Sequence, residues 1–247
     1  AAPGPSEPLG VLGMDAASAR YQSGTAVREL PDVDAALAWL FAGGRRFLAF
    51  RSRDLAELNA GYRARTSPSV NLPILDARSS EILLAVSRLA RGERDENPLA
   101  VVVLAIAPQP SRPLAVDLAG KLEVLGWDVR EPAGAVVASV VPGRAYEFVI
   151  YYRVVDRITG SWDTFIHVDG FQRRFNGDHP TLQGKYPFAL WRRGDVLADR
   201  HRFRLEPHFG AGRYSVYFGL YAGSRRLEVR RGDHDANRIV AGTLEVR

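Results

Sequence analysis

The feature that most constrains this chain is a succession of short strand-like segments that fills its second half. From about residue 114 onward, β-branched and aromatic residues recur in short runs, and Pro-Gly, Thr-Gly and Asn-Gly pairs separate the runs. Many short strands without helical periodicity between them are typical of an antiparallel β-sandwich. The expected strands are 136–141, 146–155, 164–168, 202–205, 213–221, 226–229 and 238–246.

Residues 25–113 have a different pattern, in which helices and strands alternate. Pro31 and Asp32 favour a helix start, and Gly43 follows the apolar run that would form the helix. We expect a second helix after Asp54. The expected strands of this part are 46–50, 74–75, 82–86 and 99–107.

These patterns predict an α+β protein with two domains. A small α/β domain would span residues 25–113, and an antiparallel β-sandwich of carbohydrate-binding type would span 114–247. The prolines between residues 108 and 113 would mark the boundary. Residues 1–24 begin with a Pro- and Gly-rich stretch and are expected to be a linker or lead-in.

Charge and cysteine content exclude several classes of protein. The formal net charge is +5, but the arginines are dispersed instead of gathering on one helix or alternating with stacking aromatics. We therefore expect no nucleic-acid partner. Cysteine is absent, which excludes disulfide scaffolds, thiolate metal sites and cysteine nucleophiles. The first residues show no charged and then apolar region, so no signal peptide is expected within them.

No sequence motif indicates catalysis, a cofactor or a metal. The G-x-S-x-G, H-E-x-x-H and G-x-G-x-x-G patterns are all missing. Asp233, Asp235 and Asn237 place oxygens at alternate positions, like the start of a calcium loop. Arg238 and Leu244 stand where an EF-hand needs glycine and glutamate, which leaves either a non-EF calcium site or a turn rich in Asp and Asn.

Polar and aromatic residues gather around one expected strand and the loop after it. Strand alternation places His167 and Asp169 on one face, and the following loop carries Asp178 and His179. Carboxylates and imidazoles can hydrogen-bond sugar hydroxyls beside flat aromatic rings. The predicted carbohydrate-binding residues are Trp162, His167, Asp169, Asp178, His179, Tyr186 and Trp191.

Other interpretations of these residues stay open. Asp178 and His179 would alternatively hold a long loop in place, and His167 would be a satisfied histidine within a sheet. Trp191 would alternatively be a core residue of the sandwich. Asp169 and Asp178 would also suit glycoside hydrolysis if their carboxyl groups lay at the required separation.

Several short stretches resemble the soluble C-terminal, extracytoplasmic region of bacterial membrane glycosyltransferases. The family meant is of the protein-mannosyltransferase and aminoarabinose-transferase type, whose catalytic acids lie on membrane-side loops absent from this chain. The stretch Leu75 to Glu81 resembles the linker domain of the same proteins. In the second half the matching stretches are 125–128, 142–143, 151–154, 165–169, 174–179, 191–199, 212–221 and 237–238.

The resemblance implies a non-catalytic accessory region of a membrane glycosyltransferase at the periplasmic or extracytoplasmic face of the membrane. Its partners would be the membrane portion of the transferase and a glycan or lipid-linked sugar. Two alternatives remain at this point, namely a stand-alone periplasmic carbohydrate-active hydrolase and a purely structural interaction domain whose aromatics form the core.

Overall fold

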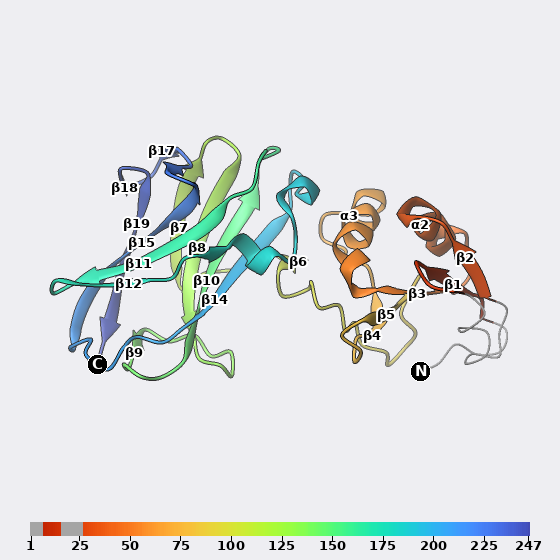
Figure 1. The fold of residues 1–247 in the computed structure, drawn as a ribbon, viewed down its shortest axis with the longest axis horizontal. Helices are drawn as coiled ribbons and strands as arrows, with labels where there is room; N and C mark the ends of the chain where they lie inside the picture. Colours follow the sequence, from red (N-terminus) through yellow and green to blue (C-terminus); the bar gives the residue numbers. More distant parts are fainter. Residues whose placement is uncertain (1–6, 16–26) are drawn as a thin grey trace. The chain divides into compact units, whose positions relative to one another are not determined.

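The computed structural model describes residues 7–15 and 27–247, and the chain divides into two compact units, 1–101 and 102–247 (Figure 1). The expected fold class, α+β with a small α/β domain before an antiparallel sandwich, is wrong. The chain is mostly β, with 43% strand and 13% helix, and its strands form three sheets. Among the described residues the α-helices are α2 and α3, both in the first unit, and all other regular elements are strands and short 3₁₀ turns.

The first unit is a five-stranded mixed sheet in the order β2-β1-β3-β5-β4. Strand β1 pairs parallel with β2 and β3, whereas β5 pairs antiparallel with β3 and β4. Two helices lie on one side of this sheet (Figure 1). The elements are β1 (Leu9–Leu12), β2 (Val27–Leu30), α2 (Val33–Phe41), β3 (Phe47–Arg51), the 3₁₀ turn η1 (Ser52–Asp54), α3 (Leu55–Arg65), β4 (Ile74–Asp76) and β5 (Ile82–Val86).

Both expected helices are confirmed, although they begin in different ways. Asp32 caps α2, because its Oδ1 accepts a hydrogen bond from the Ala35 N–H at 2.7 Å. Asp54 makes no side-chain cap, and α3 instead continues from the turn η1. The buried side chains of α2, among them Leu37 and Leu40, form one face that packs on the sheet and on α3.

Two expectations about this part of the chain need correction. Residues 9–12 are not a lead-in but the fully buried strand β1, with partners on both edges. Its four residues are too short, and too close to prolines and glycines, to stand out in the sequence. The rest of the expected lead-in, 1–6 and 16–24, lies outside the described residues. Within 99–107 only Val103–Leu104 form a strand, which belongs to the second unit.

The second unit contains two sheets. One has the order β17-β7-β8-β10-β14-β6, and the other has β12-β11-β15-β19-β18 with β13, β16 and β9 paired beside it. Its elements are β6 (Val103–Leu104), β7 (Arg112–Leu118), β8 (Leu122–Arg130), β9 (Ser139–Val140), β10 (Tyr146–Val154), β11 (Asp163–Gly170), β12 (Arg173–Asn176), β13 (His179–Pro180), η2 (Thr181–Gly184), η3 (Phe188–Leu190), β14 (Val196–Phe203), β15 (Gly212–Ala222), β16 (Arg225–Arg226), β17 (Val229–Arg231), β18 (His234–Asp235) and β19 (Arg238–Val246).

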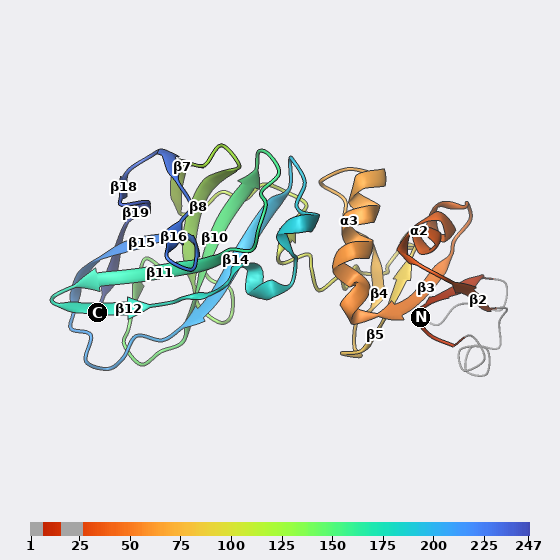
Figure 2. The ribbon, with the colours of Figure 1, turned by 45° about the horizontal axis from the view of Figure 1, so that its top comes forward.

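The two sheets pack face to face around a shared core, an arrangement consistent with a β-sandwich. In Figures 1 and 2, β11 and β12 cross in front of β8 and β10 of the other sheet. Trp127 on β8 is fully buried, and its Nε1 donates to the Ala241 carbonyl on β19 at 2.9 Å. The expected strand 213–221 lies within β15, and its alternate residues Tyr214, Val216, Phe218 and Leu220 are buried, so this face belongs to the core.

None of the helices in the described part of the chain is long and apolar enough to cross a membrane.

Candidate functional site

The side of the β11–β15 sheet that faces away from the core carries a group of rings. We call this group the aromatic face and define it as Trp162, Phe165, His167, Tyr217 and Tyr221. Strand alternation places Phe165 and His167 on one side of β11, although Phe165 is only 3% exposed. Trp162 precedes β11 and is included because Arg225 lies over its ring. His167 lies directly opposite Tyr217 in the neighbouring strand β15.

Gly219 leaves space on the aromatic face for a neighbouring ring. It lies opposite Phe165 in the strand register, between Tyr217 and Tyr221. The Phe165 ring fills the space above it, and a Cβ on residue 219 would come within 2.8 Å of Phe165 Cζ. The Phe165 centroid is 5.0 Å from that of His167 and 6.2 Å from that of Tyr221. A glycine is therefore required here by close side-chain approach, and Phe165 forms the floor of the face.

An ion-pair group borders the aromatic face. Arg174 donates from Nε and Nη2 to the two carboxylate oxygens of Asp169, each at 2.7 Å. Arg238 Nη1 lies 3.6 Å from Asp169, and the Arg238 guanidinium also covers the Tyr217 ring at 4.4 Å. Burial alone would raise the pKa of Asp169, but the hydrogen bonds and charge of Arg174 outweigh it and lower that pKa. Asp169 is therefore a carboxylate at neutral pH.

His167 is a neutral imidazole at the centre of this group. Burial and the charge of Arg174 lower its pKa, against the opposite effects of Asp169 and Asp178. Its Nδ1 is buried without a hydrogen-bond partner. The tautomer that carries hydrogen on Nε2 leaves only a lone pair unsatisfied at Nδ1, which costs less than an orphaned N–H. Nε2 is then a donor available on the aromatic face.

Two arginines lie over the remaining rings. The guanidinium of Arg225 is 5.7 Å from the Trp162 centroid, and that of Arg226 is 5.5 Å from the Phe165 centroid. Among the described residues, no carboxylate lies within ion-pair distance of either guanidinium. Strand β16 holds both residues beside the end of β15, opposite Tyr221 and Ala222. The aromatic face thus combines apolar rings with donors and acceptors at its margin.

His179 belongs to a separate network between the sheets. Its Nε2 is 3.2 Å from Asp199 Oδ1, and its Nδ1 is 2.7 Å from the Gly177 carbonyl. Burial would lower the pKa of His179, but Asp199 and Gly177 outweigh this and raise it, because both ring nitrogens face acceptors. Asp199 also accepts from Thr164 Oγ1 at 2.6 Å and from the Leu182 N–H at 2.9 Å.

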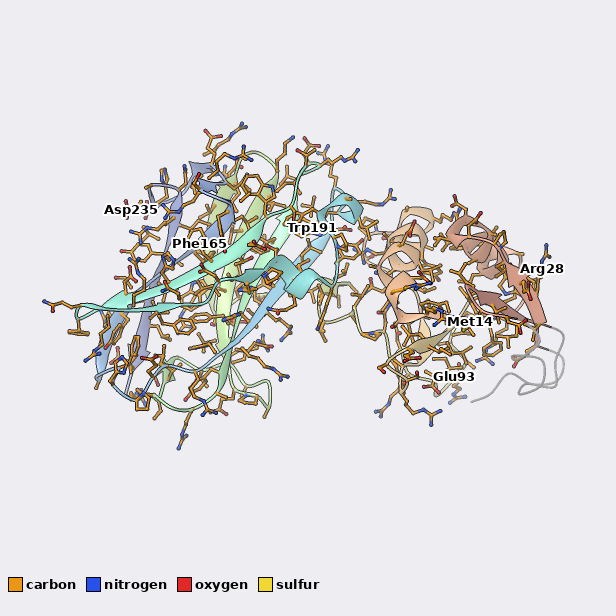
Figure 3. The ribbon with its side chains drawn as sticks, in the orientation of Figure 1. Met14, Arg28, Glu93, Phe165, Trp191 and Asp235 are labelled. Carbon is orange, nitrogen blue, oxygen red and sulfur yellow. The ribbon has the colours of Figure 1, made fainter. Side chains whose placement is uncertain are left out.

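Tyr186 and Trp191 are core residues and offer no ring to a ligand. Trp191 is 3% exposed, its Nε1 donates to the Tyr186 carbonyl at 2.9 Å, and its ring packs on Phe188 at 4.1 Å. Figure 3 shows Trp191 well away from Phe165 on the second unit. Of the open interpretations, the one in which Trp191 is a core residue agrees with this burial.

The structure thus brings together only part of the predicted site. His167 and Asp169 lie on one face, Trp162 lies at its margin beside Arg225, and the exposed Asp178 lies within electrostatic reach of His167. His179, Tyr186 and Trp191 lie elsewhere and are buried. Sequence reasoning missed five residues, although alternation along 213–221 would have placed two of them opposite the core. They are Phe165, Arg174, Tyr217, Tyr221 and Arg238.

The residues considered for calcium form a hairpin turn. Asp235 pairs with Arg238, and Asn237 Oδ1 accepts from the Val229 N–H at 3.0 Å. Ala236 and Asn237 both have positive φ, as the tight turn between β18 and β19 requires. These oxygens are therefore engaged within the turn. Across residues 7–15 and 27–247, no group of three or more acidic or imidazole side chains has the geometry of a metal site.

Comparison with known proteins places the chain in no family. No protein-family model and no curated protein matches it. The C-terminal domain of Wzt is similar at 16% identity and a TM-score of 0.36, over 56% of this chain and 82% of that one. A Niemann-Pick type C2 protein from the Japanese carpenter ant shows 7% identity and a TM-score of 0.35, over 54% of this chain and all of the other (100%). Similarity at these scores implies nothing about function.

Proposed function

We propose that this chain recognises a glycan or a lipid-linked sugar through the aromatic face and has no catalysis of its own. It is the extracytoplasmic accessory region of a membrane glycosyltransferase, the class that its sequence motifs resemble. Its partners are then the sugar and the membrane portion of that transferase, on the periplasmic or extracytoplasmic side. The proposal rests on the motifs for its setting and on the aromatic face for its chemistry.

The observation that carries the proposal is the composition of the aromatic face. Phe165 is only 3% exposed, so the rings that a ligand can reach on this side of the sheet are those of the partly exposed Tyr217 and Tyr221. Tyr217 and Tyr221 flank Gly219 on the solvent side of a strand whose other side is core. Pyranose rings present C–H groups on one side, and such groups pack well on aromatic rings.

The polar groups at the margin suit the hydroxyls around the edge of a sugar. His167 Nε2 is a neutral donor, whereas the exposed Asp178 is an acceptor close enough to influence the pKa of His167. The Arg225 guanidinium adds donors beside Trp162, and Arg226, whose Nη1 donates to the Ala236 carbonyl at 3.1 Å, has further N–H groups near Phe165. A site that binds hydroxyls needs donors and acceptors that are not already hydrogen-bonded within the protein.

The same geometry argues against a glycoside hydrolase at this face. Such an enzyme needs one carboxylic acid whose pKa is raised so that it can protonate the leaving oxygen. Asp169 has its pKa lowered, and both of its oxygens accept hydrogen bonds from Arg174. Asp169 is therefore unsuited to the role of the acid, and the proposal is binding without hydrolysis.

A panel of mono- and oligosaccharides tests the proposal through thermal unfolding and binding titration of the whole chain. A ligand that binds only the folded state raises the unfolding midpoint. We expect at least one sugar to do so, and we expect Tyr221→Ala and His167→Ala to weaken its binding by roughly tenfold or more, since a stacked ring or a hydrogen bond contributes on this order.

The matched control is Phe171→Ala, which removes an exposed ring outside the aromatic face. This variant should bind the sugar as the unaltered chain does. If no sugar in the panel raises the midpoint, or if Tyr221→Ala and His167→Ala bind it unchanged, the aromatic face does not recognise sugar and the proposal is wrong.

A further inference from the structure

The turn between β11 and β12 exposes an aromatic side chain in an unfavourable backbone conformation. Phe171 and Gln172 form the two-residue loop of this hairpin, and their φ angles are +49° and +59°. Such a turn favours Asn-Gly or Asp-Gly, because positive φ is costly for bulky residues. The hairpin itself would form more easily with those residues, so its requirements do not explain a phenylalanine at this place.

Packing does not explain Phe171 either, since most of its ring is exposed to solvent. One edge rests on Gly212, where a Cβ would come within 2.7 Å of the ring. The ring also meets Tyr214 edge-on at a centroid distance of 5.2 Å. Even so, 64% of the residue remains exposed. The ring is therefore held in a fixed direction while most of its apolar area faces outward.

Two exposed arginines lie on strands next to this ring. Arg173 follows the turn, and no carboxylate of the described residues lies within ion-pair distance of it. Arg213 follows Gly212 in the neighbouring strand β15, on the opposite face of that strand from the ring, and its side chain is 75% exposed with a single carboxylate, Glu245, 4.0 Å away. Arg174 is not one of these arginines, because its charge is paired with that of Asp169. The tip of the hairpin thus presents an exposed apolar ring, with Arg173 next to the turn in sequence and Arg213 on the adjoining strand.

We propose that this tip, defined as Phe171, Gln172, Arg173 and Arg213, docks on the surface of an anionic lipid bilayer. Aromatic rings at an interface bury their apolar area among the upper acyl chains, and neighbouring basic residues are attracted to anionic headgroups. The outward direction and fixed placement of the ring fit insertion into a plane. The two exposed arginines of the tip, Arg173 and Arg213, add the positive charge that anionic headgroups attract.

Co-sedimentation of the whole chain with vesicles tests this assignment. Vesicles of equimolar phosphatidylglycerol and phosphatidylcholine should bind the chain, and vesicles of phosphatidylcholine alone should bind it several-fold less. Phe171→Ala should weaken binding to the anionic vesicles by roughly tenfold, because the apolar area of the ring is lost. Arg173→Ala combined with Arg213→Ala should weaken it several-fold and reduce its dependence on salt.

A second measurement reports insertion directly. Phe171→Trp places a tryptophan at the tip, and brominated phosphatidylcholine in the anionic vesicles should quench its fluorescence well beyond the level seen for the four native tryptophans. Tyr221→Ala is the control for sedimentation, since it alters the aromatic face and leaves the tip unchanged. This control also keeps a failure of sugar binding separate from a failure of membrane docking.

Three results would overturn the assignment. The unaltered chain would fail to sediment with anionic vesicles, Phe171→Ala would sediment as strongly as the unaltered chain, or the tryptophan at position 171 would show no extra quenching. Self-association without vesicles that depends on Phe171 would also count against docking on lipid. It would assign the tip to an interface between two copies of the chain.

Discussion

At the scale of single residues, the pair of stacked histidines between the sheets has opposite proton affinities. His179 and His201 lie with their ring centroids 4.4 Å apart and nearly parallel. Asp199 raises the pKa of His179 against the effect of burial. Burial and then the charge of His179 lower the pKa of His201 to about 4, against the attraction of Asp199. His179 therefore binds a proton at a higher pH than His201 does.

This arrangement predicts a stability that is highest near pH 6.5 and falls on the acid side. Between pH 6.5 and about 4, His201 binds a proton in the unfolded chain but not in the folded chain. The free energy of unfolding therefore decreases as the pH falls through this range. The raised pKa of His179 acts in the other direction, since its contribution is present below pH 6.5 and is lost as the pH rises through the folded pKa. The acid limb should amount to about 1–2 kcal/mol after allowance for solvent screening.

Urea unfolding of the whole chain at several pH values measures both limbs. His201→Phe keeps a flat ring against His179 and removes the titration, so the loss between pH 6.5 and 4.5 should shrink by about 1–2 kcal/mol. An acid limb of the same size in His201→Phe would assign it to other groups. The carboxylates of Asp128 and Asp169 do not produce this limb, because their lowered pKa values place their effect below about pH 4.

At the scale of elements, strand β15 shows how much the sequence predicts. Tyr214, Val216, Phe218 and Leu220 alternate along it, and all four are buried in the structure. The strands expected at 146–155 and 238–246 correspond closely to β10 and β19. A period of two with turn residues on both sides is a local signal, and these strands carry it clearly.

Other strands could not be found in this way, because polar residues that interrupt their pattern are satisfied by distant partners. The expected strand 202–205 is in fact the end of β14, whose earlier part contains the buried Asp199. Strand β8 contains Asp128, which is buried because Arg130, Tyr151 and the Ser111 N–H pair with it. Strand β8 went unpredicted for this reason.

The candidate site was predictable to the same degree. His167 and Asp169 share a face by alternation alone, and this holds in the structure. The burial of His179 depends on Asp199, twenty residues further along the chain, and that of Trp191 depends on its packing with Phe188 and Tyr186. No local pattern shows which of several aromatic residues in a loop will be buried, because tertiary contacts determine this.

The two faces of β15 give a matched pair of substitutions. Phe218→Ala should cost about 3–5 kcal/mol of unfolding free energy, because it removes a ring that is 1% exposed and leaves a cavity. Tyr217→Ala, one residue earlier on the aromatic face, should cost less than about 1 kcal/mol, since the ring is partly exposed and its main contact is the Arg238 guanidinium. Urea unfolding monitored by fluorescence distinguishes the two, and equal losses would contradict the assignment of the faces.

At the scale of the whole molecule, each unit has its own core. The first unit buries Leu48 on β3 and Leu37 on α2, and the second buries Trp127 and Phe218 between its sheets. The division falls between Val101 and Val102, and Val101 is 50% exposed. Domains with separate cores and an exposed connection are expected to unfold as separate cooperative units.

Calorimetry of the whole chain tests this division with one substitution in each core. Leu48→Ala should cost the first unit about 2–5 kcal/mol and lower only the transition of that unit. Phe218→Ala should lower only the other transition, because its cavity lies in the second unit. Heat capacity traces of the two variants would then differ from that of the unaltered chain in different transitions. A single transition that both substitutions shift equally would show one cooperative unit, in which the stability of the sheet that carries the aromatic face depends on the first unit as well.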